Sequence, residues 1–426
     1  MPSSSPQVRS PVWHPFTQHG VLGDVPRIVG AHGAKLECAD GRRLIDAISS
    51  WWVTTHGHGE PRIASAISEA AGTLDQVIFA GLTHPAAEDV ARGLVRLAPP
   101  SRTRPALAHV FFSDSGSTSV EVALKMALGY WRNVGDVRRT RILALEGAYH
   151  GDTVGAMSAG ARGVFNAPYA PLLFDVGRLP FPTPGAAQET LDALEAAARA
   201  KDVAALIVEP LILGAGGMLI YHAETLREMA AICHTHDVLL IADEVMTGWG
   251  RTGTLWACAQ AGITPDIMCV AKGLTGGTLP LAATLATSPI FDAHVSTDRA
   301  RMFFHSSSYT ANPICCAAAR ANIAIWESEP VIERITALAA RQAAALSAFA
   351  SDPRFSDVRR LGTITALDVK SGSPGYLADI GPRLYAASLD RGVLLRPLGS
   401  TLYVMPPYCI SDAELAAVYA TIDAIV

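Results

Sequence analysis

The stretch that decides the fold runs from residue 238 to residue 277 and reads VLLIADEVMTGWGRTGTLWACAQAGITPDIMCVAKGLTGG. It contains two apolar runs that end at charged side chains: Val238–Ala242 precedes Asp243, and Ile267–Ala271 precedes Lys272. An acid and an amine at the ends of core segments are poorly solvated, so each needs a partner. We interpret the pair as serving the two ends of one aromatic cofactor.

Four further apolar runs surround this stretch, with helical patterns between them. They are His109–Phe112, Ile142–Leu145, Ala204–Val208 and Leu281–Ala286. Continuous apolar strands that alternate with amphipathic helices predict an α/β fold, in which helices cover both faces of a mostly parallel central sheet. Ligands bind such sheets at the carboxyl ends of the strands.

Polar segments directly follow five of the predicted strands. They are Asp114 to Gly116, Gly147 to His150, Glu209, Asp243 and Lys272. Because the carboxyl ends of parallel strands meet at one edge of a sheet, we predict that these segments converge on one site.

With 426 residues, the chain exceeds the ~250–300 residues at which single cores stop growing, so two domains are expected. Residues 57–320 carry the strand and helix alternation and are predicted to form the large, cofactor-binding domain. Residues 1–56 and 321–426 are predicted to form a smaller α+β domain together. The strand-like segments of this smaller part are Ala34–Asp40, Ile364–Val369, Val393–Arg396 and Leu402–Met405.

Composition narrows the class of partner. The 34 basic and 39 acidic residues form no block of like charge, so a small molecule is expected rather than nucleic acid or a membrane surface. The seven cysteines are scattered and odd in number, which favours reduced core thiols. No run of about 18 apolar residues and no signal sequence is visible, so we expect a soluble cytoplasmic protein.

Lys272 and Asp243 carry the chemistry that this pattern suggests. Desolvation lowers the pKa of an amine toward its nucleophilic neutral form, which suits a Schiff base with an aldehyde. A carboxylate can keep a pyridine nitrogen protonated, so that the ring accepts electrons. The alternatives are a lysine that extends from the core into solvent and an aspartate that caps a turn.

Residues 114–131, DSGSTSVEVALKMALGYW, predict a helix whose start is a phosphate site. Gly116 and Ser117 would offer free N–H groups at the positive end of the helix dipole, although serine is also an ordinary helix cap. Tyr149, just beyond a strand, could stack on a flat cofactor. We interpret His150 as an ordinary loop histidine rather than a proton donor.

A second hydroxyl-rich segment, FFHSSSYTANP, contains Ser306, Ser307 and Ser308, which can cap the following helix or bind phosphate. Arg396 follows a predicted strand and suits bidentate binding of a substrate carboxylate, or is a surface arginine. No spacing of histidines, cysteines and carboxylates predicts a metal site.

Five motifs in this order resemble one family. DSGS, GAYHGDT, ADEVMTGWGRTG, AKGLTGG and YTANP look like the class III, or omega, aminotransferases. These are pyridoxal-phosphate enzymes with the aspartate aminotransferase fold, also called fold type I. The similarity spans nearly the whole chain, and it implies pyridoxal phosphate as the cofactor.

The resemblance implies a role for each matching residue. Lys272 would bond to the cofactor and move the proton, and Asp243 would pair with the pyridine nitrogen. Gly116 and Ser117 would hold the phosphate, helped by Ser307 and Ser308 of a neighbouring subunit in a homodimer with two shared sites. The implied substrate contacts are Trp51, Trp52, Tyr149, Lys272, Ser306 and Arg396, the last of which would bind the carboxylate.

Within the class, the segments WHPFTQ, DAISSWW, FAGLTHPAAE and RPLGSTLYVMPPY resemble the biotin-pathway branch. This branch converts 8-amino-7-oxononanoate into 7,8-diaminononanoate. The Trp51-Trp52 pair favours S-adenosylmethionine as the amino donor, whereas PFTQ and SYT resemble a lysine-using branch. Two departures from the family pattern are Phe16 in place of tyrosine, and HSSS, with Ser306 and Ser308, where many members read HGPT.

Two other functions remain open from the sequence. One is an omega-aminotransferase that uses ornithine, 4-aminobutyrate, β-alanine or a diamine. The other is a non-catalytic protein that binds pyridoxal phosphate.

Overall fold

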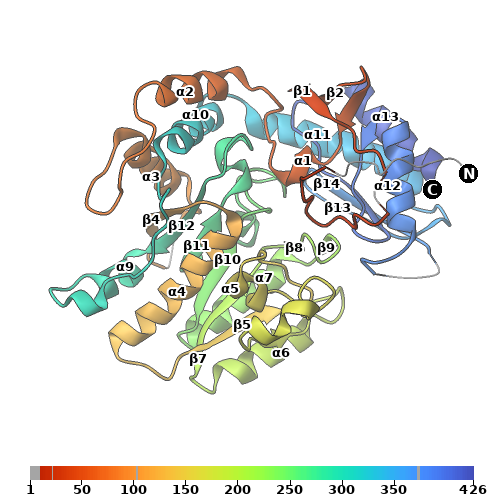
Figure 1. Cartoon of the computed structure of the whole chain (residues 1–426). Helices are drawn as coiled ribbons and strands as arrows, with labels where there is room; N and C mark the ends of the chain where they lie inside the picture. The colour runs from red at the N-terminus through yellow and green to blue at the C-terminus, as the bar shows by residue number, and fades with distance from the viewer. Residues whose placement is uncertain (1–9, 22, 102–103, 372–374) are drawn as a thin grey trace, which may run out of the picture.

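The computed structural model describes residues 10–21, 23–101, 104–371 and 375–426. A seven-stranded sheet lies at the centre of the described part, with strand order β4-β12-β11-β10-β7-β5-β6 (Figure 1). Its strands are β4 (Leu107–Ser113), β5 (Arg141–Leu145), β6 (Gly177–Leu179), β7 (Val203–Val208), β10 (Leu239–Asp243), β11 (Ile267–Val270) and β12 (Ala282–Thr287). Neighbouring strands pair in parallel except at β12, which is antiparallel to β11 and β4.

The prediction of a mostly parallel sheet is confirmed, and each strand predicted for it is present. The sequence prediction missed β6 at the edge of the sheet. This strand has only three residues, Gly177–Leu179, so it leaves no apolar run in the sequence.

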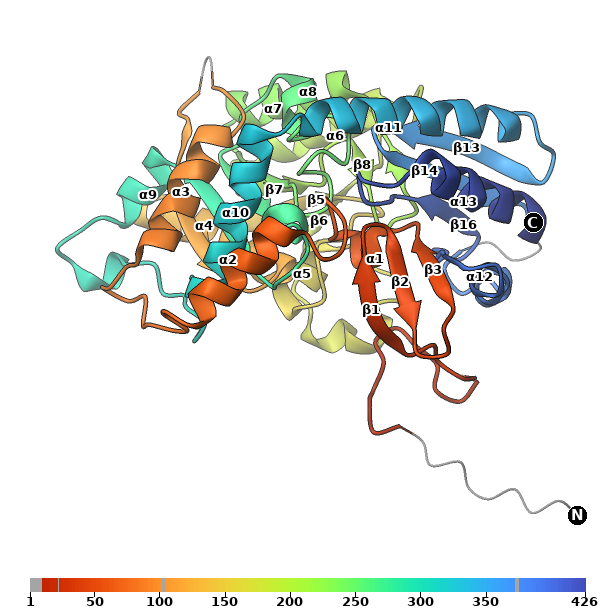
Figure 2. The same cartoon turned by 90° about the horizontal axis from the view of Figure 1, so that it is seen from above.

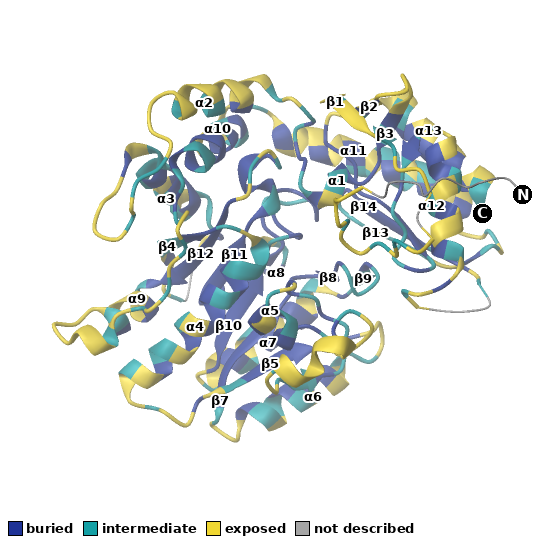
Figure 3. Ribbon diagram, in the orientation of Figure 1, coloured by how far each residue is buried: buried dark blue, intermediate teal, exposed yellow. Residues whose placement is uncertain are grey.

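Helices cover both faces of the sheet. Successive side chains of a strand point to opposite faces, and apolar side chains on both faces must be buried. On β5, Ile142 and Ala144 pack with the apolar side of α4, whereas Leu143 and Leu145 pack on the opposite face. The helices of these two layers are α4 (Gly116–Val134) on one face and α6 (Ala187–Ala198) and α7 (Ala223–Thr235) on the other. Figure 3 shows the sheet strands as buried and the outer sides of the helices as exposed.

The β4, β12 and β11 end of the sheet has its own cover. Here α3 (Pro85–Leu97) and α10 (Pro313–Ser328) pack on Met268, Val270 and Leu285. The outer neighbour of α10 is α2 (Pro61–Ala71). The elements that remain around the large sheet are α1 (Ser49–Trp52), α5 (Val154–Ala159), α8 (Cys258–Ala261), α9 (Ser288–His294), β8 (Ile212–Leu213) and β9 (Leu219–Ile220).

Two smaller sheets bring the ends of the chain together. One has the order β1-β2-β3-β15 and the other β13-β14-β16. Their strands are β1 (Ile28–His32), β2 (Lys35–Cys38), β3 (Arg43–Asp46), β13 (Phe355–Leu361), β14 (Ile364–Val369), β15 (Val393–Leu394) and β16 (Thr401–Val404). The accompanying helices are α11 (Val331–Leu346), α12 (Ile380–Asp390) and α13 (Asp412–Ile425).

The parallel pairing of β15 with β3 joins residues near the two termini in one sheet. Figure 2 shows β1, β2 and β3 beside α12, which belongs to the last fifty residues of the chain. The predicted boundary between the large and small domains, at residues 320 and 321, falls inside the continuous helix α10. The domain boundaries stay a prediction.

All seven cysteines are free, and most are buried in the core. Across the described ranges, no helix is long and apolar enough to cross a membrane.

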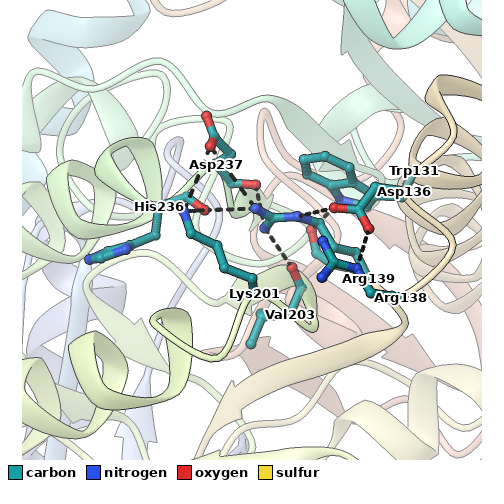
Figure 4. A network of polar contacts seen from close by, with 9 residues as sticks. Trp131, Asp136, Arg138, Arg139, Lys201, Val203, His236 and Asp237 are labelled. Atoms are coloured by element: carbon teal, nitrogen blue, oxygen red, sulfur yellow. Dashed lines mark hydrogen bonds and ion pairs between the residues drawn. The ribbon is translucent and has the colours of Figure 1, made fainter.

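A buried arginine fixes the amino ends of three neighbouring strands (Figure 4). Arg139 lies in the loop before β5. Its guanidinium donates hydrogen bonds of 2.9–3.1 Å to the carbonyl oxygens of Val203, Asp237 and His236. Its Nε also donates to Asp136, and Trp131 covers the cation at 4.3 Å. The loops that lead into β5, β7 and β10 thus depend on one side chain.

We predict that Arg139→Leu lowers the free energy of unfolding by about 3 kcal/mol or more, because buried carbonyls and the Asp136 carboxylate lose their donor. Arg138 is the matched control, since its side chain is 75% exposed against 4% for Arg139, and both bind Asp136. Arg138→Ala should change stability by less than about 0.5 kcal/mol. Equal denaturant midpoints for the two variants would show that the network contributes little.

Candidate active site

A cavity of about 490 Å³ lies at the carboxyl ends of the central strands. Most of the residues predicted for the site line it together, so the predicted convergence is confirmed. The predicted residues that line the cavity are Trp51, Trp52, Gly116, Ser117, Tyr149, Asp243, Lys272 and Arg396. Asp114, Glu209 and Val245 contribute further parts of the wall.

The position of Asp243 follows from the strand register. Asp243 ends β10 and lies opposite Cys269 of the parallel neighbour β11, so Lys272 emerges at the same edge of the sheet. The Asp243 carboxylate is buried. Its Oδ1 accepts a hydrogen bond from the Val245 N–H at 3.1 Å, and its Oδ2 lies 2.8 Å from His150 Nδ1.

His150 is a member of the site that sequence reasoning left aside. Its ring is buried, it lines the same cavity, and its Nδ1 lies against the Asp243 carboxylate. Its other nitrogen, Nε2, is buried with no hydrogen-bond partner in the described structure. The sequence feature that could have indicated this role is the position of His150 beside Tyr149 after a predicted strand. The same position is also typical of an ordinary loop histidine.

Lys272 begins a 3₁₀ turn directly after β11, with φ of +45°. Residues other than glycine adopt this conformation at a cost of about 1–3 kcal/mol, and such strain concentrates at functional sites. The ammonium lies 4.7 Å from the centre of the Trp52 ring. Burial lowers the pKa of Lys272 to about 8, against the opposing effect of the Asp243 and Glu209 charges.

The start of α4 forms an anion cradle on the same cavity. Ser115 caps the helix through reciprocal bonds with Thr118, which leaves the N–H groups of Gly116 and Ser117 free of helical partners. A side chain at Gly116 would come within 2.6 Å of Val245 Cγ1, so only glycine fits here. Helix α4 has 19 residues, and its positive dipole end faces the cavity.

Glu209 fixes the loop that carries Tyr149. Its carboxylate accepts hydrogen bonds from the backbone N–H of Tyr149 and of Gly214, each at 2.9 Å. Burial, with a smaller contribution from the nearby Asp243 charge, raises the pKa of Glu209 to about 7, although His150 and the two backbone hydrogen bonds oppose the shift. Burial also raises the pKa of the Tyr149 hydroxyl, so this group stays protonated.

The two tryptophans are held by a strained turn. The buried carboxylate of Asp46 accepts hydrogen bonds from the Ser50 N–H and hydroxyl, and it lies 2.8 Å from His58 Nε2. Ser50 and Trp52 have φ of +58° and +65°. Trp52 Nε1 donates to the hydroxyl of Tyr403 at 2.9 Å, which locks the indole against β16.

Arg396 stands at the outer end of the cavity. Its guanidinium lies 5.1 Å from the centre of the Trp51 ring and donates to the carbonyl oxygen of Phe16 at 3.2 Å. Phe16 contacts the Trp51 ring at 5.9 Å between centroids. The residue that departs from the family pattern therefore lies within the predicted substrate region.

The three predicted serines do not line the cavity of their own chain. They lie in the turn before α10, where Ser307 Oγ accepts from the Tyr309 N–H and Gln76 donates to the Ser308 carbonyl oxygen. Ser306 Oγ donates to the Ser307 carbonyl oxygen. A role for these serines at the site of a neighbouring subunit stays a prediction.

Sequence reasoning also missed Phe165 and Tyr376, which line the cavity. Neither belongs to a periodic pattern or follows a strand of the central sheet. Only the folded chain brings them together.

The cavity fits an anionic heteroaromatic molecule with a reactive carbonyl. It offers an amine, an acid that can pair with a ring N–H, and a helix start for an anion. The close contact at Gly116 and the low pKa of Lys272 both favour such a ligand over ordinary core packing.

Comparison with known proteins identifies similar chains over nearly the full length. The adenosylmethionine-8-amino-7-oxononanoate aminotransferase of Synechococcus elongatus is 49% identical over 420 residues, covering 96% of this chain and 97% of the relative. The crystal structure of the enzyme of that name from Methanocaldococcus jannaschii has a TM-score of 0.91 and 32% identity, with 97% of each chain covered. An amine transaminase from an uncultivated Pseudomonas species, in its PLP-bound internal aldimine form, has a TM-score of 0.89 and 30% identity, with 98% of each covered.

These similarities confirm the aspartate aminotransferase-like fold that the motifs predicted. The model of the family described as aminotransferase class-III matches residues 23–426. The chain belongs to the class-III aminotransferase family.

Proposed function

We propose that this aminotransferase converts 8-amino-7-oxononanoate into 7,8-diaminononanoate in biotin synthesis, with pyridoxal phosphate as cofactor and S-adenosylmethionine as amino donor. The observation that carries the chemistry is one cavity that unites Asp243, Lys272 and the start of α4. The names of the similar enzymes and the Trp51-Trp52 wall support the choice of substrates.

The residues fit the cofactor at three points. Asp243 would pair with the ring nitrogen, Gly116 and Ser117 would hold the phosphate, and Tyr149 would contact the ring. Bound pyridoxal phosphate supplies an aldehyde that condenses with amines and a ring that withdraws electrons from the bond being broken. His150 keeps the Asp243 carboxylate oriented through the 2.8 Å contact.

Lys272 moves the protons of the reaction. With a pKa of about 8, roughly a tenth of its amine is neutral at pH 7, far more than for an ordinary lysine, and this form can act as a base. In the first half-reaction Nζ takes a proton from the amine-bearing carbon of the donor. In the second it delivers a proton to the former carbonyl carbon of the acceptor.

One pocket accepts both substrates in turn. Trp51 and Trp52 supply apolar walls, and Arg396 binds the carboxylate of 8-amino-7-oxononanoate. Lysine is the second candidate donor, favoured by Phe16 in the PFTQ segment.

We expect a homodimer with two shared sites. Ser307 and Ser308 would help to hold the phosphate at the site of the neighbouring subunit, and Ser306 would contact the substrate there. Apolar side chains that are exposed in the single chain flank the serine turn, namely Met302, Phe304 and Tyr309. Together with the exposed Ile78 and Leu82, they suit contact with a second copy.

The purified protein should form 7,8-diaminononanoate from 8-amino-7-oxononanoate and S-adenosylmethionine, measured by mass spectrometry. Lys272→Ala should lower the rate by at least about 10²–10⁴-fold, because it removes the group that moves the proton. Lys370→Ala, at an exposed lysine, is the control and should keep full activity. No diaminononanoate from any amino donor would overturn the proposal.

Shared sites predict that two inactive variants restore each other. Ser308→Asp places a negative charge against the phosphate of the neighbouring site, and Lys272→Ala removes the lysine. After the two are unfolded and refolded together in equal amounts, about a quarter of wild-type activity should return, since mixed dimers contain one intact site. No recovery, with dimers present by sedimentation, would mean that the serines serve no neighbouring site.

A further inference from the structure

Four aromatic side chains form a continuous row at the outer end of the cavity. Trp51 contacts Phe16, and Phe16 contacts Phe165, each at 5.9 Å between ring centres. Phe165 in turn contacts Tyr376 at 4.4 Å, with an angle of 60° between the rings. We call these four residues the aromatic row.

The row is assembled from segments that are far apart in the chain. Phe16 precedes β1, Trp51 lies in α1, Phe165 follows α5, and Tyr376 lies between β14 and α12. All four line the cavity, yet none is fully buried. Phe16 and Trp51 are each 44% exposed. Apolar ring faces that remain open beside a cavity favour a ligand that covers them.

The charges around the row favour a flat neutral group. The acidic residues among the described cavity residues are Asp114, Glu209 and Asp243, which lie at the carboxyl ends of strands of the central sheet. The charged group that contacts the row is the Arg396 guanidinium, over Trp51. A second ammonium group on a donor would meet the Arg396 cation here, with no carboxylate of the described lining beside the row to pair with.

We propose that the aromatic row, and Phe165 and Tyr376 in particular, form a stacking subsite for the purine of a nucleoside-bearing amino donor. This inference rests on the proposed function and assigns the residues that select the donor. Purine faces stack on aromatic side chains without needing specific hydrogen bonds. The donor's reacting amine lies at Lys272, while its purine covers the row.

The acceptor gains much less from this subsite. 8-Amino-7-oxononanoate is an aliphatic chain that ends in a carboxylate, and Arg396 binds that end. Loss of the Phe165 or Tyr376 ring should therefore weaken donor binding selectively.

The test separates the two half-reactions on the cofactor-loaded enzyme, followed by cofactor absorbance. In Phe165→Leu and in Tyr376→Leu, the donor concentration for half-maximal rate with S-adenosylmethionine should rise roughly ten-fold. The acceptor half-reaction should change less than about two-fold. Phe165→Tyr should keep donor binding, and Phe174→Leu, at an exposed phenylalanine outside the cavity, should match the wild type.

Adenosine provides a second measurement that does not depend on turnover. It should inhibit the wild type in competition with the donor, and roughly ten-fold more should be needed in Phe165→Leu. Unchanged donor and adenosine affinities in both leucine variants, or equal weakening of both half-reactions, would overturn the inference. A wild type that reacts with lysine but not with S-adenosylmethionine would instead reject the proposed donor, and this is visible before any variant is made.

Discussion

The buried carboxylate of Asp243 is the constraint on which the site depends. A buried charge is tolerated only where hydrogen bonds or an opposite charge compensate its lost hydration. His150 and the Val245 N–H provide two such contacts, and they come from the loops after β5 and β10. The strand register then brings Lys272 to the same edge. Three strands must keep their alignment for one acid to be stable, and this alignment also positions the amine.

The two ends of the sheet serve different purposes. At the amino ends, Arg139 donates hydrogen bonds to three backbone carbonyls, and its cation also binds Asp136 and Trp131. At the carboxyl ends, some polar groups of the described residues have no hydrogen-bond partner, such as His150 Nε2 and the first N–H groups of α4. Backbone strain is also found here, at Lys272. Because the amino ends of the strands are fixed, the carboxyl ends can hold unpaired polar groups in position for a ligand.

Much of this arrangement was predictable from the sequence, because an apolar run followed by a charge marks both a buried strand and its functional end. Asp243 and Lys272 were found in this way. The edge strand β6 was not, since three residues leave no pattern. The contact between Phe165 and Tyr376 depends on tertiary packing of distant loops. The segment with Ser306, Ser307 and Ser308 departs from the usual family pattern, and its role at the site of a second subunit stays a prediction.

Asp243 and Lys272 share one solvent-poor site, and this is the feature on which the proposed chemistry depends most. Reductive methylation of the cofactor-free protein across pH, read at Lys272 by mass spectrometry, tests it directly because only the neutral amine reacts. The midpoint should lie at about 8, since burial lowers the pKa of Lys272. In Asp243→Asn it should fall further, because the Asp243 charge raises that pKa. A midpoint near the ordinary lysine value of about 10.4, or one that Asp243→Asn leaves unchanged, would contradict the account.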